Sequence, residues 1–192
     1  MEKINNFPEF RSFQKIFRYS RECTITEKID GSNAIIYIDF DMNIFAGSRT
    51  RWLWGSIQDE IHNDNHGFAQ WVKEHKEELL SLGTGFHYGE WMGQGINRNY
   101  GLTEKRFYLF NVKKWMNNPY TPECCYVVPI LFEGMFTTEN IETTLNYLKE
   151  TGSVAVPTFS SPEGIVIFHK HSGHLYKKTI VGDEKPKGQK DE

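Results

Sequence analysis

Short hydrophobic runs rich in β-branched residues, separated by polar and turn residues, recur along this chain and predict a protein built mainly of β-strands. The clearest strands are expected at 24–28 and 33–40, where β-branched residues dominate and Asp30-Gly31 connects the two runs. The last two runs are predicted to form a hairpin around Ser172-Gly173. The same pattern predicts strands at 43–47, 84–91, 106–114, 124–133, 163–169 and 173–181.

Two segments instead carry apolar side chains at the three-to-four-residue spacing that is typical of helices. The first covers 66–82 and ends before Gly83. The second begins at Thr137 or Thr138 as an N-cap and ends before Gly152. Mostly strands with two inserted helices predict an α+β fold in which two antiparallel sheets are flanked by helices.

The chain has 192 residues, a length that predicts one domain rather than two. We expect this domain to cover 1–181. Residues 182–192 are charged and contain proline and glycine, and we expect them to form a flexible tail.

Charge and composition narrow the class of protein. The net charge of −3 excludes a chain coated with positive charge, so a polynucleotide would have to bind at a local patch such as Arg49–Arg51. No apolar stretch reaches the length of a membrane span, and the first residues lack the apolar segment of a signal peptide. These features predict a cytoplasmic protein without a membrane partner.

Lys28 ends the first predicted strand and is followed by Asp30, Gly31 and Asn33. A lysine in a pocket wall can attack a phosphorus atom when nearby cations or a metal lower its pKa. The Lys-x-Asp-Gly match alone is equally compatible with a plain strand and turn. Its meaning depends on the chemistry that the rest of the chain supplies.

Later segments supply groups suited to holding a nucleotide. Arg49 follows the third predicted strand, where a guanidinium can bind a phosphate or a ribose hydroxyl. Glu90 lies between a glycine and a tryptophan, and its carboxylate can accept from a ribose hydroxyl or hold a metal. Phe110 offers an aromatic face on which a purine can stack.

The end of the chain adds an acid and two cations. Glu163 begins a buried strand and is an oxygen ligand of the kind that Mg²⁺ takes together with substrate phosphates. Lys177 and Lys178 lie on the last strand, where a cation can neutralise a triphosphate. Each residue also has a purely structural interpretation, as core aromatic, strand-end carboxylate or solvated edge. Those interpretations leave the order of the residues unexplained.

That order resembles the covalent nucleotidyltransferase superfamily of ATP-dependent DNA ligases, RNA ligases and mRNA capping enzymes. The closest resemblance is to the RNA ligases of the bacteriophage T4 RNA ligase 2 type and the trypanosome editing ligases. Glu27 and Asn33, on either side of the Lys-x-Asp-Gly motif, favour the RNA ligases. The resemblance rests on five segments, at 27–33, 46–50, 89–96, 107–112 and 163–166.

The resemblance implies a nucleotidyltransferase domain of ATP-grasp-like fold that uses ATP and Mg²⁺ or Mn²⁺. Lys28 would attack the α-phosphate of ATP to give a lysyl–AMP, and the AMP would pass to an RNA 5′-phosphate before a 3′-hydroxyl seals the strand. Catalytic roles would fall to Lys28, Glu163 and Lys177, and metal binding to Glu163 and Glu90. The nucleotide would be bound by Glu27, Lys28, Ile29, Asn33, Arg49, Glu90, Phe110, Lys177 and Lys178.

Three positions depart from the family pattern. Phe168 stands where ligases of the RNA ligase 2 type have a further lysine, so phosphate binding is expected to be weaker or to use Lys170 instead. Asn111 stands where the family has aspartate, which weakens a metal or ribose role there. The last motif has adjacent lysines, which on a strand point to opposite faces, so only one enters the pocket, and the register favours Lys177.

The short segment after Thr179 leads us to expect no OB-fold domain, and leaves room for a separate subunit that recognises RNA ends. Three alternative functions remain open from the sequence. They are a minimal DNA ligase, a capping-type guanylyltransferase and a non-catalytic nucleotide-binding module.

Overall fold

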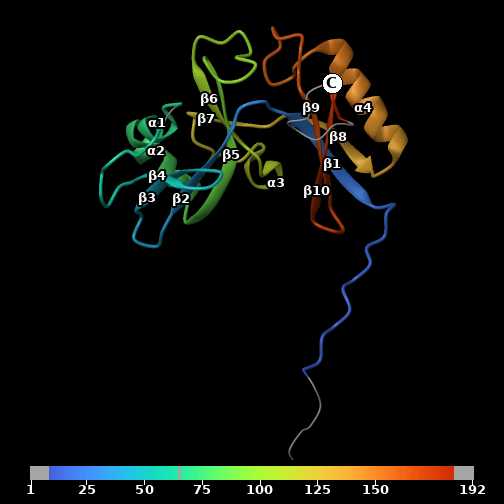
Figure 1. Ribbon diagram of the computed structural model, residues 1–192, viewed down its shortest axis with the longest axis horizontal. Coiled ribbons are helices and arrows are strands. Elements are labelled where there is room, and N and C mark those ends of the chain that lie inside the picture. The colour runs from blue at the N-terminus through green and yellow to red at the C-terminus, as the bar shows by residue number, and fades with distance from the viewer. Residues whose placement is uncertain (1–8, 65, 184–192) are drawn as a thin grey trace, which may run out of the picture.

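Two β-sheets form the body of the protein in the computed structural model, which describes residues 9–64 and 66–183 (Figure 1). The larger sheet has six strands in the order β4-β3-β2-β5-β6-β7, and the smaller has four in the order β10-β9-β1-β8. The strands of the six-stranded sheet are β2 (Ser32–Ile38), β3 (Ile44–Ser48), β4 (Trp52–Gly55), β5 (Gly85–Gly93), β6 (Lys105–Leu109) and β7 (Cys125–Val127). Those of the four-stranded sheet are β1 (Glu22–Lys28), β8 (Ile130–Met135), β9 (Gly164–His169) and β10 (His174–Thr179).

The prediction of two wholly antiparallel sheets is wrong at one edge, because β6 and β7 run parallel. The cause is the segment predicted as one strand at 124–133. It is interrupted at Val128 and Pro129, and its two halves join different sheets as β7 and β8. Proline has no amide hydrogen for a strand ladder. The carbonyl of Pro129 instead accepts from the N–H of Glu27, at 3.1 Å.

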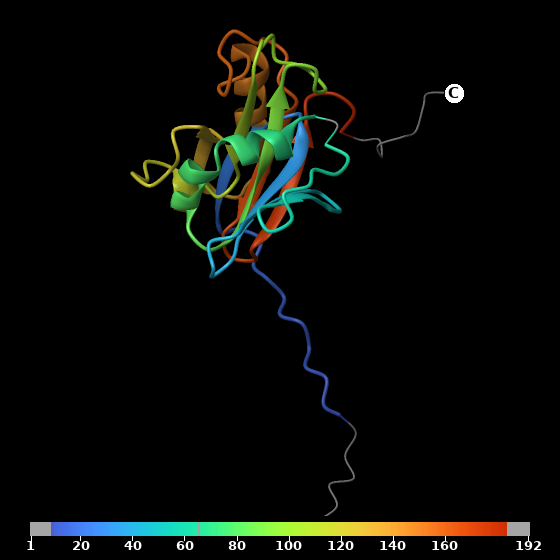
Figure 2. The same cartoon turned by 90° about the vertical axis from the view of Figure 1, so that its left-hand side faces the viewer.

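Helices cover the outer face of each sheet, giving four layers (Figures 1 and 2). The helix predicted at 66–82 is instead three short pieces, α1 (Phe68–Glu74), α2 (Lys76–Leu79) and η1 (Leu80–Leu82). The break falls at His75, whose ring Nδ1 lies 2.9 Å from the carbonyl oxygen of Trp71. Apolar residues of α1, α2 and η1 pack against the six-stranded sheet.

The second predicted helix is confirmed as α4 (Thr138–Thr151). The hydroxyl of Thr137 accepts from the N–H of Asn140 at 3.2 Å and caps its first turn. Gly152 follows the last turn with φ 85°, a backbone conformation that favours glycine. Leu145 and Leu148 pack with Ile25 and other residues of the four-stranded sheet, so α4 covers its outer face.

A third apolar cluster lies where the two sheets meet, between the inner face of the six-stranded sheet at Met92 and Tyr108 and the segments that connect it to the four-stranded sheet. Its buried members are Ile29, Met92, Tyr100, Tyr108, Val128 and Val156. The cluster lies beside the end of β1, so Lys28 stands at the edge of the contact between the sheets. Residues 9–20 run outward from β1 as an extended segment (Figure 2). Within the described part of the chain, no helix has the length and apolar content needed to cross a membrane.

Candidate active site

Lys28 and Glu163 form an ion pair at the inner face of the four-stranded sheet. Lys28 is the last residue of β1 and pairs in register with Gly164, so Glu163 stands next to it at the start of β9. The two side chains are only 18% and 8% exposed, and a charged pair so little exposed depends on mutual contact for stability. The structure thus brings together two of the residues predicted to be catalytic.

Gly164 makes this close arrangement sterically feasible. Its φ is 156°, and a Cβ there would lie 2.2 Å from the carbonyl oxygen of Lys178 on β10. A larger residue would therefore push β9 and β10 apart, and with them the acid that pairs with Lys28. The close approach of β9 and β10 therefore explains why the predicted Glu-Gly motif has glycine at position 164.

Glu90 lies on the inner face of the six-stranded sheet and holds the turn that follows Lys28. One carboxylate oxygen accepts from the N–H of Gly31 at 3.0 Å, and the other from the side-chain amide of Asn33 at 3.2 Å. Burial, with the nearby charges of Glu163 and Asp30, raises the pKa of Glu90 to about 7 against the opposing effects of the Gly31 hydrogen bond and Lys28. Acids from both sheets therefore meet beside the lysine.

This pKa predicts a pH-dependent stability of the free protein. A carboxyl whose folded pKa is raised from 4.5 to about 7 stabilises the fold below pH 4.5, and this stabilisation is lost as the pH rises through 7. Glu90→Gln removes the titrating proton. We expect the free energy of unfolding of the variant, relative to wild type, to rise by about 2–3 kcal/mol between about pH 5 and pH 8.

Urea unfolding at the two pH values, without metal or nucleotide, measures this difference. Titrating groups that do not interact with Glu90 are shared by both proteins and cancel in the comparison. If the variant and wild type differed in free energy of unfolding by the same amount at both pH values, the pKa of Glu90 would not be raised in the folded protein.

A loop that the sequence did not identify completes the turn after Lys28. The Asp30 carboxylate accepts from Arg98 Nε and from Asn97 Nδ2, both at 2.9 Å, and the Asp30 N–H donates to the Tyr100 hydroxyl at 2.9 Å. Arg98 also donates to the carbonyl of Ser161 at 3.1 Å. These contacts join the turn to the segment that leads into Glu163. The only sequence signal was the cluster of Gly93, Gly95 and Asn97 behind Glu90.

Glu27 was expected in the nucleotide pocket, but its side chain lies on the opposite face of β1 from Lys28. It is 1% exposed, and burial raises its pKa. Its carboxylate accepts from the Ser153 hydroxyl at 2.6 Å and from the N–H groups of Val154 and Ala155 at 2.8 and 2.9 Å. Glu27 therefore positions the segment before Glu163 from behind the sheet.

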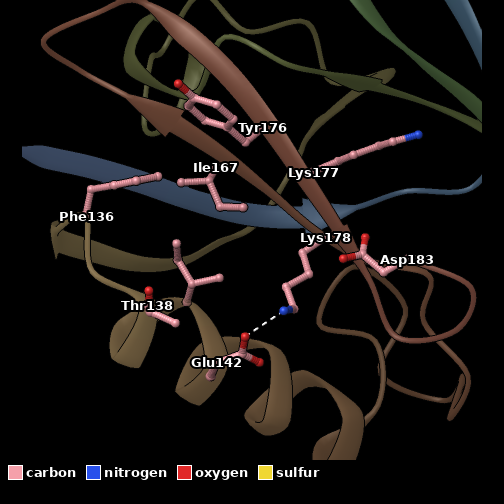
Figure 3. A pocket seen from close by; sticks show the side chains of 9 residues that line it. Phe136, Thr138, Glu142, Ile167, Tyr176, Lys177, Lys178 and Asp183 are labelled. Carbon is pink, nitrogen blue, oxygen red and sulfur yellow. Dashed lines mark hydrogen bonds and ion pairs between the residues drawn. The ribbon is translucent and has the colours of Figure 1, made fainter. Parts of the chain in front are cut away.

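The two adjacent lysines of β10 point to opposite faces, as the sequence predicted. Lys178 pairs in register with Ile165, which is buried beneath α4, and its Nζ donates to Glu142 of α4 at 2.6 Å. Figure 3 shows this contact in a hollow beside α4, with Lys177 directed away from it. Lys177 shares the inner face with Lys28. The structure thus places Lys178 away from Lys28, contrary to its assignment to the pocket.

Arg49 and Phe110 lie at the rim of the inner face of the six-stranded sheet. Arg49 is exposed on the turn after β3, and because Ser48 pairs with Ala34 it stands close to the Asn33 end of β2. Phe110 follows β6 directly, its N–H donates to the Tyr88 carbonyl at 3.0 Å, and the residue is 40% exposed. Both positions permit contact with a ligand between the sheets.

Ile29 and Asn111 have mainly structural surroundings. The side chain of Ile29 is buried in the third apolar cluster, where the two sheets meet. Asn111 caps a short helix, α3 (Val112–Trp115), where its side-chain oxygen accepts from the N–H of Lys114 at 3.1 Å. The strand predicted at 106–114 therefore ends early, at Leu109.

Among the described residues, no cluster of three or more histidine, cysteine or acidic side chains could hold a metal alone. Mg²⁺ in nucleotide-transferring sites needs only one or two carboxylates together with substrate phosphates, so the residues present fit this arrangement. Both oxygens of Glu90 already accept hydrogen bonds. Glu163 is therefore the better-placed carboxylate for a metal.

The family model for RNA ligases matches residues 21–179. The chain belongs to the RNA ligase family. The match begins just before β1 and ends with the last residue of β10, so it includes Lys28, Glu90, Glu163 and Lys177. No curated protein matches the chain.

Several solved structures of Naegleria gruberi RNA ligase variants share the fold. One, without ligand, has a TM-score of 0.60 at 20% identity, over 84% of this chain and 50% of that one. Another, with AMP and Mn, has a TM-score of 0.60 at 20% identity, over 90% and 57%. A third, with ATP and Mn, has a TM-score of 0.56 at 22% identity, over 82% and 48%. The matched region thus spans about half the length of these proteins.

Proposed function

We propose that this chain is the nucleotidyltransferase domain of an ATP-dependent RNA ligase that joins 5′-phosphate and 3′-hydroxyl RNA ends. The observation that carries the proposal is the Lys28–Glu163 pair beside Glu90, at the junction of the two sheets of an RNA ligase fold. A nucleophile, an acid that can accept its proton and a second acid converge there from three strands or strand ends. We also propose that the two sheets form an ATP-grasp-like nucleotidyltransferase fold.

The first step is attack of the uncharged Lys28 amine on the α-phosphorus of ATP. The proton must leave Nζ first, and the Glu163 carboxylate, already in contact with Nζ, is the acceptor. A nitrogen–phosphorus bond forms, the bond to pyrophosphate breaks, and AMP stays on Lys28. Lys177, on the same face of the sheet, neutralises charge on the phosphates.

Two further transfers complete the reaction. An oxygen of an RNA 5′-phosphate attacks the phosphorus of the lysyl–AMP, the nitrogen–phosphorus bond breaks, and Lys28 leaves as an amine that takes back the proton held by Glu163. A 3′-hydroxyl then attacks the adenylylated 5′-phosphate and loses its proton to solvent, forming the phosphodiester and releasing AMP. Mg²⁺ or Mn²⁺ held by Glu163 and the phosphates would neutralise developing negative charge.

The nucleotide is proposed to lie between the inner faces of the sheets. Phe110 would stack on adenine, because its partly exposed ring lies at the rim of this face. Asn33 and Arg49 would bind the ribose and phosphate from neighbouring positions of β2 and the β3–β4 turn. The backbone of Ile29 would contribute to the pocket wall.

The Naegleria gruberi ligase variants support these assignments by spacing. The positions altered in them include a lysine and an aspartate two positions later, and a glutamate and a lysine fourteen positions apart. Lys28 and Asp30 have the first spacing, and Glu163 and Lys177 have the second. Lys178 would break the second match. The structures of the altered glutamate and the later altered lysine contain AMP or ATP with Mn, in agreement with the proposed cofactors.

Incubation with α-labelled ATP or GTP and Mn²⁺, followed by denaturing electrophoresis, tests the nucleotide. We expect covalent label from ATP only, whereas label from GTP alone would favour a capping-type guanylyltransferase. Absence of label from both would favour a non-catalytic module. Sealing assays on matched nicked, single-stranded and hairpin RNA and DNA then separate an RNA ligase from a minimal DNA ligase.

A further inference from the structure

Five aromatic side chains form a continuous strip on the inner face of the six-stranded sheet. The aromatic strip consists of Tyr37, Phe45, Trp52, Phe86 and Tyr88, from strands β2, β3, β4 and β5. Tyr37 and Phe86 stack with ring centroids 4.4 Å apart and planes 28° apart. Phe86 also lies at 13° to Tyr88 and 25° to Trp52. Neighbouring rings therefore lie close together. They are stacked around Phe86, whereas the rings of Tyr37, Phe45 and Trp52 are tilted to one another by 32° to 55°.

The strip is exposed, although its residues are large and aromatic. Trp52, Phe86 and Tyr88 are 49%, 53% and 53% exposed, whereas the outer face of the same sheet is buried beneath α1 and α2. A contiguous exposed patch of this kind marks an interaction site. The cost of leaving so much aromatic surface in water calls for a functional reason.

The strip is continuous with the candidate active site. Glu90 and Tyr88 share the inner face of β5, as Asn33 and Tyr37 share that of β2. Tyr88 also accepts through its carbonyl from Phe110, the residue proposed to stack on adenine. From Glu90 to Phe86 is four strand residues, or about 13 Å at the usual rise of a β-strand. That distance accommodates two or three nucleotides of an extended strand.

Charges at the two ends of the strip have opposite signs. Arg49 and Arg51 lie on the β3–β4 turn beside the active-site end and are exposed. Asp39 lies just beyond Tyr37 at the far end, where hydrogen bonds from Asn43 lower the pKa of its carboxyl, so it carries a negative charge. A polyanion would therefore be attracted to the end nearest Lys28 and repelled from the far end.

We propose that the aromatic strip binds the unpaired bases of a single-stranded RNA segment next to the end that is joined. This inference rests on the proposed function and adds to it the class of substrate. Sheet faces that carry exposed aromatic residues bind single-stranded nucleic acid by stacking bases on the rings, while cations hold the backbone. A base-paired duplex hides these base faces, so the strip selects substrates whose ends are unpaired.

The affinity of the protein for a labelled single-stranded RNA, measured by fluorescence anisotropy in the absence of ATP, tests whether the strip binds RNA. We expect Phe86→Leu and Trp52→Leu each to weaken binding about 5- to 150-fold, the range for loss of one base–ring stack. Leucine keeps apolar volume but removes the aromatic plane. Trp52→Phe retains a ring and is expected to bind within about threefold of wild type. Tyr120→Ala, which changes an exposed aromatic side chain outside the strip, is the matched control.

Three results would overturn the proposal. One is equal RNA binding by wild type, Phe86→Leu and Trp52→Leu, and another is tighter binding of a blunt duplex than of the single strand. The third is concentration-dependent self-association that Phe86→Leu abolishes without changing RNA affinity, which would assign the strip to a protein interface. Covalent AMP labelling of wild type is measured separately. Its absence would refute the proposed function while leaving the binding result interpretable.

Discussion

Lys28→Ala protein is expected to form no covalent AMP, with a loss of at least about 10³-fold relative to wild type, because the variant lacks the attacking nitrogen. The measurement is retention of label from α-labelled ATP after denaturing electrophoresis. Lys28→Arg is the more informative second variant, since guanidinium keeps the positive charge opposite Glu163 but does not act as the nucleophile. We expect it to be equally inactive and to remain folded.

Lys149→Ala is the matched control for this experiment, because Lys149 is exposed on α4 and far in the fold from the inner face. It should label as wild type does. Persistent labelling of folded Lys28→Ala would place the nucleophile elsewhere and refute the assignment.

Lys177→Ala is expected to slow AMP transfer to Lys28 by about 10²- to 10³-fold, the usual effect of removing one group that stabilises transition-state charge. Lys178→Ala should change the rate less than about threefold. The two residues are chemically identical neighbours whose side chains lie on opposite faces of β10. Both variants remove the same positive charge, so a difference in rate reports on the position of the side chain. Single-turnover labelling rates provide the comparison.

The expected cost of Lys178→Ala lies in stability. Its partly exposed ion pair with Glu142 contributes up to about 1 kcal/mol to the free energy of unfolding. If Lys178→Ala slowed AMP transfer as much as Lys177→Ala does, the side-chain directions described for β10 would not be those of the active protein.

Local patterns in the sequence predicted most strands because short runs of β-branched residues bounded by turn residues are typical of strands. The prediction failed where the partner, rather than the segment, decides the structure. The run at 124–133 is uniformly strand-like, and only the interruption at Pro129 indicates that its halves enter different sheets. Trp52–Gly55 was missed because four residues between turns show too little periodicity.

Local motifs predicted the residues of the candidate site, but they did not predict several of the contacts that these residues make. Lys28 and Glu163 are far apart in the sequence, and their contact depends on the register of β1 with β9. The supporting contacts of Arg98 and Ser153 come from loops without a recognisable motif. Glu27 was assigned to the pocket by resemblance, although strict alternation along β1 places it behind Lys28.

The central claim is that Lys28 carries AMP. Wild-type protein incubated with ATP and Mn²⁺, digested and analysed by mass spectrometry under conditions that preserve phosphoramidates, tests it most directly. The account predicts an adenylyl group on the peptide that contains Lys28, and its release when a 5′-phosphorylated RNA is added. An adenylyl group on another residue, or an unmodified Lys28 peptide after incubation with ATP and metal, would contradict it.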